Sequence, residues 1–314
     1  MARSTSSPVA SPGTSANAVP GRPIALHLLV SLRPGQWTKN LLVFAGILFG
    51  RRLFDAGAVV DAVSAFAVFC VLSGVVYLVN DIADRDSDRQ HPLKARRPIA
   101  SGELPVPVAV TAAIVLGTAA LAGAAALGPR FAGVAAGYLA LQLLYSGPLK
   151  HLVIIDVLTL AIGFVLRAVA GAVAVNVEIS HWLLVCTILL ALFIALAKRR
   201  HEITLLAGEA AHHRPILGEY SPYLLDQMIA VVTASTLMAY VFYTISPETQ
   251  EKFGTPWLGL TIPFPLYGIF RYLYLVHQRE GGGSPAELLL TDRPLLLCVA
   301  LWALTVALII YRPV

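Results

Sequence analysis

The sequence predicts an all-α integral membrane protein, a bundle of nine transmembrane helices, and three observations support this fold class. First, the 314 residues are 57% hydrophobic and only 13% charged, with a mean hydropathy of +0.73, whereas soluble domains carry about 25% charged residues. Second, apolar stretches of the roughly 20 residues that a helix needs to cross a bilayer recur along almost the whole chain. Third, positive charge alternates between the loops that join them.

The nine apolar stretches are separated by short polar segments, and each is expected to form one span. They cover residues 36–54, 57–79, 105–127, 130–147, 152–175, 180–197, 223–245, 256–276 and 294–311. Residues 1–23 are rich in Ser, Pro and Ala and cannot bury enough apolar surface to fold, so we expect a disordered N-terminal arm. Residues 24–314 then form a single polytopic membrane domain, because no linker or soluble segment divides them.

The distribution of lysine and arginine predicts the orientation of the chain. If the N-terminus is cytoplasmic, sixteen of the 23 Lys and Arg residues fall on the cytoplasmic side and five on the other. Cytoplasmic loops carry the excess of positive charge, so we expect a cytoplasmic N-terminus and a C-terminus outside. The net charge of +5 follows from this topology, and no nucleic-acid-binding motif accompanies it. The main polar loops, 80–104 and 198–222, both face the cytoplasm in this arrangement.

A group of oxygen-bearing side chains follows the second span. On a helix that continues past this span, Asp81, Asp84 and Asp88 share one stripe, and Asn80 lies about 100° from Asp81. Carboxylates at this spacing repel one another, so they must be solvated, paired with arginines or neutralised by divalent cations. An oxygen-rich face suits Mg²⁺, which binds one or two carboxylates together with substrate phosphates.

A basic cluster directly follows the stripe and helps to decide whether the stripe is a solvated helix end or a metal site. Lys94, Arg96 and Arg97 can bind phosphate oxygens, although cytoplasmic loops commonly carry such charge. A carboxylate stripe at the end of a membrane span, beside a cluster of cations, favours a Mg²⁺–diphosphate site over a solvated helix end. We therefore expect such a site at the cytoplasmic surface.

Further candidates for substrate binding lie near the cytoplasmic ends of other spans. Tyr145 and Lys150 flank the end of the fourth span in the segment YSGPLKH. An interfacial tyrosine and a snorkelling lysine are the plainer interpretation of these two. Lys198, Arg199 and Glu202 follow the sixth span in the sequence AKRRHEITLL, where they combine cations with one carboxylate.

Two ionisable residues lie inside the fifth predicted span. Asp156 and Arg167 share one helix face with Thr159 and Gly163. An ionisable residue at membrane depth faces the interior of the bundle, where it serves either a function or a structural pair between helices. Lys39, in the segment RPGQWTKN at the start of the first span, is a further candidate for substrate binding.

The motif N-D-x-x-D-x-x-x-D, followed by HPLKARRPIASG, resembles the first aspartate-rich motif of the UbiA superfamily of membrane prenyltransferases. The segments RPGQWTKN and YSGPLKH and the nine spans extend this resemblance over most of the chain. It implies a UbiA-like helical bundle, a catalytic membrane domain over 24–314 and a cytoplasmic pocket that binds diphosphates through Mg²⁺. The catalytic residues that it implies are Asn80, Asp81, Asp84 and Asp88, of which the three aspartates hold the metal.

One departure from the superfamily pattern bears on the substrates. Most members carry a second acidic motif, D-x-x-x-D, after the sixth span, and here AKRRHEITLL replaces it. A sugar phosphate donor with a lipid phosphate acceptor brings more negative charge than a prenyl diphosphate with an aromatic acceptor, because each phosphate monoester carries about −1.5 to −2. The exchange of aspartates for cations therefore favours a sugar phosphate donor with a lipid phosphate acceptor. The whole pattern resembles the decaprenyl-phosphate phosphoribosyltransferase branch of the superfamily.

Resemblance to that branch implies transfer of 5-phosphoribose from 5-phosphoribosyl 1-diphosphate (PRPP) to a polyprenyl (decaprenyl) phosphate, with release of diphosphate. It also implies Mg²⁺ as cofactor and a place in cell-wall precursor synthesis at the plasma membrane. The acceptor phosphate is already anionic, so no general base is expected. The expected substrate-binding residues are Lys39, Lys94, Arg96, Arg97, Tyr145, Lys150, Arg167, Lys198, Arg199 and Glu202.

Two alternatives stay open from the sequence. One is a UbiA-type enzyme that moves a prenyl chain to an aromatic acceptor, against which the missing second acidic motif argues. The other is a lipid transporter without catalysis. Transporters carry charged or broken helices at the midplane of the membrane, whereas the charge here gathers at one face. The sequence also leaves open the isoprenoid chain length and whether the protein forms a homo-oligomer.

Overall fold

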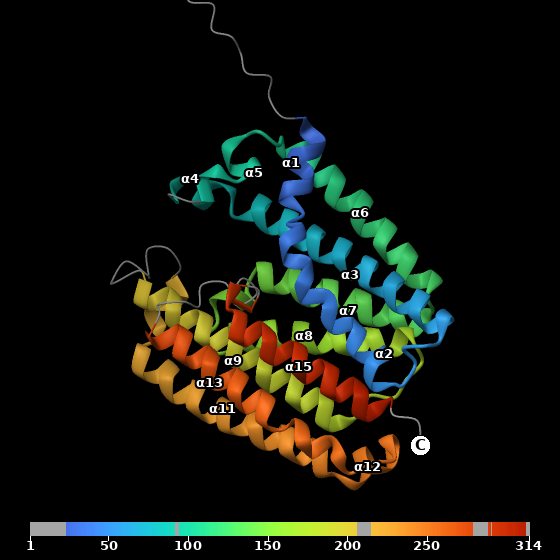
Figure 1. The fold of residues 1–314 in the computed structure, drawn as a ribbon. Helices are drawn as coiled ribbons and strands as arrows, with labels where there is room; N and C mark the ends of the chain where they lie inside the picture. The colour runs from blue at the N-terminus through green and yellow to red at the C-terminus, as the bar shows by residue number, and fades with distance from the viewer. Residues whose placement is uncertain (1–22, 92–93, 206–214, 279–287, 290, 312–314) are drawn as a thin grey trace, which may run out of the picture.

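The computed structural model describes residues 23–91, 94–205, 215–278, 288–289 and 291–311, and within these ranges the secondary structure is helical, without any strand (Figure 1). The α-helices and 3₁₀-helices (η) are α1 (Ile24–Ser31), η1 (Pro34–Phe44), α2 (Ala45–Phe49), α3 (Ala56–Ala83), α4 (Arg85–Gln90), η2 (Lys94–Arg96), α5 (Pro98–Ser101), α6 (Val106–Ala126), α7 (Pro129–Ser146), η3 (Leu149–His151), α8 (Ile155–Ala174), α9 (His181–Leu205), η4 (Pro215–Glu219), α11 (Pro222–Ile245), α12 (Pro247–Phe253), η5 (Trp257–Thr261), α13 (Pro263–Gln278) and α15 (Arg293–Ile310). The predicted arm, 1–23, lies outside the described residues except for its last residue.

Each of the nine predicted spans coincides with helical structure, which confirms the all-α class. Among the described residues, six helices are long and apolar enough to cross a membrane, namely α3, α6, α8, α9, α11 and α15. The remaining three predicted spans correspond to η1 with α2, to α7, and to η5 with α13. Helix α7 is as long as α15 but less apolar, and the other two are divided into shorter helices, so the count of nine membrane crossings is approximate.

The bundle is organised around α8 and α9. Helix α9 packs against α8 and α11, and α8 also packs against α7 and η1 (Figure 1). Helix α3 packs against α6 and η1. The end of the bundle at which α3, α7 and α9 finish and α8 begins carries the polar residues of interest, and we call it the polar end.

The first part of the first predicted span is a 3₁₀-helix, η1, and the backbone of the span touches that of α8. A Cβ atom on Gly171 of α8 would lie 1.8 Å from the carbonyl oxygen of Val43. A Cβ atom on Gly46 would lie 2.5 Å from the backbone nitrogen of Ala172. Only glycine permits such an approach of two backbones, so these two positions fix η1 and α2 directly on α8.

A buried arginine joins the same segments through polar contacts. The guanidinium group of Arg167 donates from Nε to Asn40 Oδ1 at 2.7 Å, from Nη2 to the Tyr138 hydroxyl at 2.7 Å and from Nη1 to the Gly163 carbonyl oxygen at 2.9 Å. Asn40 in turn donates to Ser73 Oγ at 3.2 Å. Because a buried charge must be hydrogen-bonded to be tolerated, this network ties η1, α3, α7 and α8 together.

The prediction of a polar loop that begins at residue 198 is wrong, because α9 continues as a helix to Leu205. Lysine, arginine and glutamate are good helix formers, and two carboxylates from other elements neutralise the arginines that extend the helix. Arg199 pairs with Asp156 and Arg200 pairs with Asp226. Lys198, Arg199 and Glu202 are therefore held on a packed helix and not on a loop.

We expect opposite effects from removing two buried tyrosine hydroxyls. Tyr138→Phe removes an acceptor from the buried Arg167 and should lower stability by about 1 to 2 kcal/mol. The Tyr272 hydroxyl has no hydrogen-bond partner among the described residues, so Tyr272→Phe should leave stability unchanged or raise it. Thermal unfolding in detergent measures both, and an equal loss in the two variants would contradict this account.

Candidate active site

The three aspartates of the first motif lie where α3 passes into α4. Asp84 stands between the two helices, yet its backbone N–H donates to the Asn80 carbonyl oxygen at 2.8 Å, and Asp88 donates to the Asp84 carbonyl oxygen at 2.8 Å. The helical hydrogen bonding thus continues through the junction, and the predicted stripe is retained. Asp81 and Asp88 are buried, and Asp84 is half-buried.

Cations from three other segments pair with this stripe. Arg97 Nη1 lies 3.0 Å from Asp81 Oδ1 and 2.6 Å from Asp88 Oδ2, so one guanidinium nitrogen bridges two carboxylates. Arg33, which precedes η1, places Nη2 2.5 Å from Asp81 Oδ1. Lys150 of η3 places its ammonium nitrogen 2.8 Å from Asp84 Oδ1. The three like charges can lie together because each has a positive partner.

The chemistry of the stripe fits a hard divalent cation. Each aspartate contacts its cations through one carboxylate oxygen. The other oxygen of each carboxylate receives no hydrogen bond from a described residue; these oxygens are Asp81 Oδ2, Asp84 Oδ2 and Asp88 Oδ1. Carboxylate oxygens are the ligands that Mg²⁺ prefers. In the described part of the chain, however, no three acidic, histidine or cysteine side chains already surround a common point. Arg97 bridges Asp81 and Asp88 instead.

A second polar group, the 198–202 patch, occupies the last turns of α9. Arg199 is buried and contacts Asp156, Glu202 and the Tyr145 hydroxyl. Lys198 is more exposed, and its ammonium nitrogen lies 3.7 Å from Glu202 Oε1. The patch thus combines one accessible cation, one buried cation and one carboxylate.

The connection from α7 to α8 lies between the stripe and the 198–202 patch. Tyr145, near the end of α7, accepts a hydrogen bond from Arg199 Nη2 at 3.3 Å. Lys150, five residues later, pairs with Asp84. The two regions that the sequence singled out therefore meet at the polar end, although more than a hundred residues separate them along the chain.

The remaining predicted residues occupy different surroundings. Lys39 lies within reach of the charges of Arg167, Arg33 and Lys198. Arg96 is exposed, and Lys94 and Asn80 are half-buried. None of the side chains of Lys39, Asn80, Lys94 and Arg96 forms a hydrogen bond or ion pair with another residue in the described ranges. Arg167, in contrast, is engaged on all three nitrogens in the interior.

Three residues at the polar end were not among the predicted site residues. Arg33 lies in the segment RPGQWTKN, whose resemblance to the superfamily was the available signal. Asp156 shares a helix face with Arg167, but eleven residues of helix separate them by about 16 Å, and its partner is Arg199. Tyr220 donates to Asp156 Oδ1 at 2.8 Å, and burial raises the pKa of its hydroxyl to about 12. No local pattern marks Tyr220.

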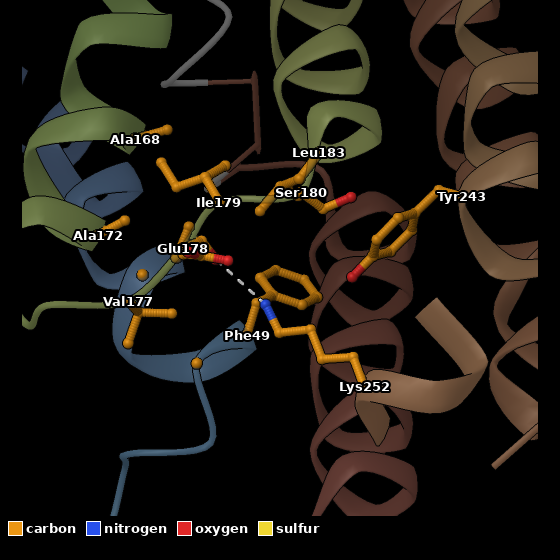
Figure 2. A pocket seen from close by; sticks show the side chains of 13 residues that line it. Phe49, Ala168, Ala172, Val177, Glu178, Ile179, Ser180, Leu183, Tyr243 and Lys252 are labelled. Carbon is orange, nitrogen blue, oxygen red and sulfur yellow. Dashed lines mark hydrogen bonds between the residues drawn. The ribbon is translucent and has the colours of Figure 1, made fainter. Parts of the chain in front are cut away.

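A pocket near the other end of α8 contains none of the predicted site residues. Its walls come from α2, the last turns of α8, the segment 177–180, α9, α11 and α12 (Figure 2). Lys252 Nζ donates there to the Glu178 carbonyl oxygen at 3.3 Å (Figure 2). The pocket encloses about 10 Å³, which is close to the space that one water needs. It is too small for a phosphorylated sugar.

The family model described as the UbiA prenyltransferase family matches residues 39–291. The chain belongs to this family. Decaprenyl-phosphate phosphoribosyltransferase of Corynebacterium glutamicum is 34% identical over 297 residues, covering 93% of this chain and 89% of that protein. The protein of the same name from Mycobacterium tuberculosis is 36% identical over 283 residues, covering 88% of this chain and 91% of that protein.

The solved structures agree with this family membership. A UbiA homologue from Archaeoglobus fulgidus, bound to GPP and Mg²⁺, matches with a TM-score of 0.71 and 22% identity over 90% of this chain and 99% of that one. This likeness confirms the predicted UbiA-like helical fold. Together with the six long apolar helices, membership in the UbiA family makes this chain a multi-pass membrane protein.

We predict that Asp84 and Asp86 differ in their effect on metal and diphosphate binding. Asp84→Asn removes a carboxylate from the stripe and should raise the Kd for inorganic diphosphate in the presence of Mg²⁺ by about tenfold or more. Asp86 is just as acidic and close in sequence, but its side chain is 90% exposed and lies off the stripe, so Asp86→Asn should not change that Kd. Isothermal titration of both variants distinguishes the two, and equal affinities would show that the stripe is not the metal site.

Proposed function

We propose that this protein transfers 5-phosphoribose from PRPP to a polyprenyl phosphate and releases diphosphate. The observation that carries the proposal is the similarity, at 34 to 36% identity over 88 to 93% of the chain, to proteins named decaprenyl-phosphate phosphoribosyltransferase. The arrangement of the polar end supports it, because the acidic stripe, the basic cluster and the 198–202 patch lie together there.

The reaction replaces one bond at the anomeric carbon of the sugar. The bond from that carbon to the diphosphate oxygen breaks, an oxygen of the acceptor phosphate bonds to the carbon, and the electron pair leaves with the diphosphate. Positive charge develops on the sugar as the bond breaks, so the site must stabilise negative charge on the leaving group. The acceptor is a phosphate monoester that is ionised at neutral pH, and no side chain is needed as its base.

In this proposal the basic residues bind the phosphate groups. Lys94, Arg96 and Arg97, which follow the stripe, bind the phosphates of the donor. Lys39, Lys150 and Lys198 supply positive charge to the remaining phosphate groups. Placing donor and acceptor side by side in a water-poor pocket lowers the barrier by fixing their orientation. Asn80 adds an amide group beside the stripe.

The carboxylates of Asp81, Asp84 and Asp88 would hold Mg²⁺. When bound there, the ion would neutralise charge on the diphosphate as it leaves. The UbiA homologue from Archaeoglobus fulgidus is bound to Mg²⁺ together with GPP in one solved structure and with DMAPP in another. We further propose that the polar end faces the cytoplasm at the plasma membrane, with the N-terminus on that side, because Lys and Arg concentrate there. The lipid product of the reaction would then enter cell-wall precursor synthesis.

Incubation of the purified full-length protein with radiolabelled PRPP and decaprenyl phosphate tests the proposal. We expect labelled lipid in the presence of Mg²⁺ and none when EDTA removes the metal. Transfer from geranyl diphosphate to an aromatic acid, with no product from PRPP, would replace the proposal with the prenyltransferase alternative. Absence of product from either pair, by protein that still binds polyprenyl phosphate, would favour a lipid transporter.

A further inference from the structure

Arg199 is buried, and each of its nitrogens donates to a different protein group. Its side chain is 2% exposed. Nε donates to Asp156 Oδ2 at 3.0 Å, Nη1 donates to Glu202 Oε2 at 2.8 Å and Nη2 donates to the Tyr145 hydroxyl at 3.3 Å. Three of its five N–H groups are used in this way, and its 2% exposure leaves a substrate phosphate little access to the other two. Arg199 therefore orients protein groups, although the sequence suggested it as a phosphate ligand.

Asp156 is the fixed end of this arrangement. It has no exposed surface, and both carboxylate oxygens are used, one by Arg199 and the other by the Tyr220 hydroxyl. The same hydroxyl accepts a hydrogen bond from the Ile154 backbone N–H at 2.7 Å. Ile154 has a φ of 69°, which a β-branched residue adopts only when its surroundings impose it. Asp156 cannot touch a substrate, but it is held firmly enough to orient Arg199.

Glu202 is the group that this arrangement presents to the polar end. Its side chain is 27% exposed, against 2% for Arg199. Glu202 lies beside Lys198, whose side chain is 43% exposed. A carboxylate is an unexpected group in a pocket for phosphates, because it repels them. Arg199 and Lys198 make this carboxylate tolerable, and its exposed surface can also be reached by a ligand group that donates hydrogen bonds.

The chemistry of the proposed substrates leaves one such group. An ionised carboxylate only accepts hydrogen bonds. At neutral pH the phosphates of both substrates are ionised and the isoprenoid chain is apolar, so the donors are the hydroxyl groups of the sugar. A metal ion is a poorer partner, because Arg199 and Lys198 already place two positive charges against this carboxylate.

On the basis of the proposed function, we propose that Glu202 accepts hydrogen bonds from the hydroxyl groups of the transferred sugar and that Asp156 positions it through Arg199. Glu202 is then a residue that determines donor specificity, and Asp156 is a positioning residue. A prenyl diphosphate carries no hydroxyl group, so this contact would also separate sugar donors from prenyl donors.

The test compares PRPP with its 2-deoxy and 3-deoxy analogues in the labelled-lipid assay. The wild-type protein should show a kcat/KM about tenfold or more lower for at least one analogue, since a site built to bind a hydroxyl rejects the compound that lacks it. Glu202→Ala should lower kcat/KM for PRPP by a similar factor and make the donors equal within about twofold. A Glu202→Ala protein that keeps the wild-type ratio would overturn the role of Glu202.

Asp156 is tested with the same ratio of kcat/KM values for PRPP and the deoxy analogue. Asp156→Asn should reduce the discrimination between PRPP and the analogue, and Tyr220→Phe, which removes only one hydroxyl, is the milder variant should Asp156→Asn fail to fold. The ratio compares two donors on one preparation, so a loss of folded protein does not move it. Unchanged discrimination in the variant or variants that fold would reduce Asp156 to a structural residue and overturn its positioning role.

Asp226→Asn is the matched control. Asp226 pairs with Arg200, the next residue of α9, at 2.6 Å, so the variant breaks a similar ion pair on the same helix. It should retain the wild-type ratio of kcat/KM values for PRPP and the analogue. A ratio that fell as far in Asp226→Asn as in Asp156→Asn would overturn the specific role of Asp156. If the wild-type protein formed no labelled lipid from PRPP, the proposed function would fail first, and this inference with it.

Discussion

The structure depends on the neutralisation of charge at one end of an apolar helical bundle. A carboxylate moved out of water costs several kcal/mol unless a cation or hydrogen-bond donors replace the water. The buried carboxylates of Asp81, Asp88 and Asp156 each find a cation from another part of the chain, Arg97 for the first two and Arg199 for the third. These ion pairs hold α3, α4, α8 and α9 in place, so the same contacts that make the charges tolerable also assemble the site.

The interior of the bundle meets the same constraint with a different set of partners. Arg167 is buried without a carboxylate, and neutral oxygens from Asn40, Tyr138 and Gly163 surround it instead. This network, together with the backbone contact at Gly171, fixes the 3₁₀-helix η1 on α8. Arg33 precedes η1, and Lys39 lies within it. The packing of the interior therefore determines where these two cations stand at the polar end.

The parts of the molecule that follow from local patterns could be predicted from the sequence. The apolar spans follow from composition, and the stripe of three aspartates follows from their spacing on one helix. The choice of partners could not be predicted, because it depends on how distant elements pack. Asp156 shares a face with Arg167 yet pairs with Arg199, 43 residues away in sequence. That pairing exists only because α9 continues past the predicted end of its span and carries Arg199 into the interior.

The balance of charge in the stripe also bears on how a metal ion could enter it. Three carboxylates are matched by three cations, Arg33, Arg97 and Lys150, so the stripe is close to neutral as it stands. A divalent cation that arrived alone would add positive charge beside these three. A divalent cation that arrived with a diphosphate would bring its own counter-charge, and the cations could exchange a carboxylate partner for a phosphate partner. The arrangement therefore favours joint binding of metal and diphosphate over binding of the metal alone.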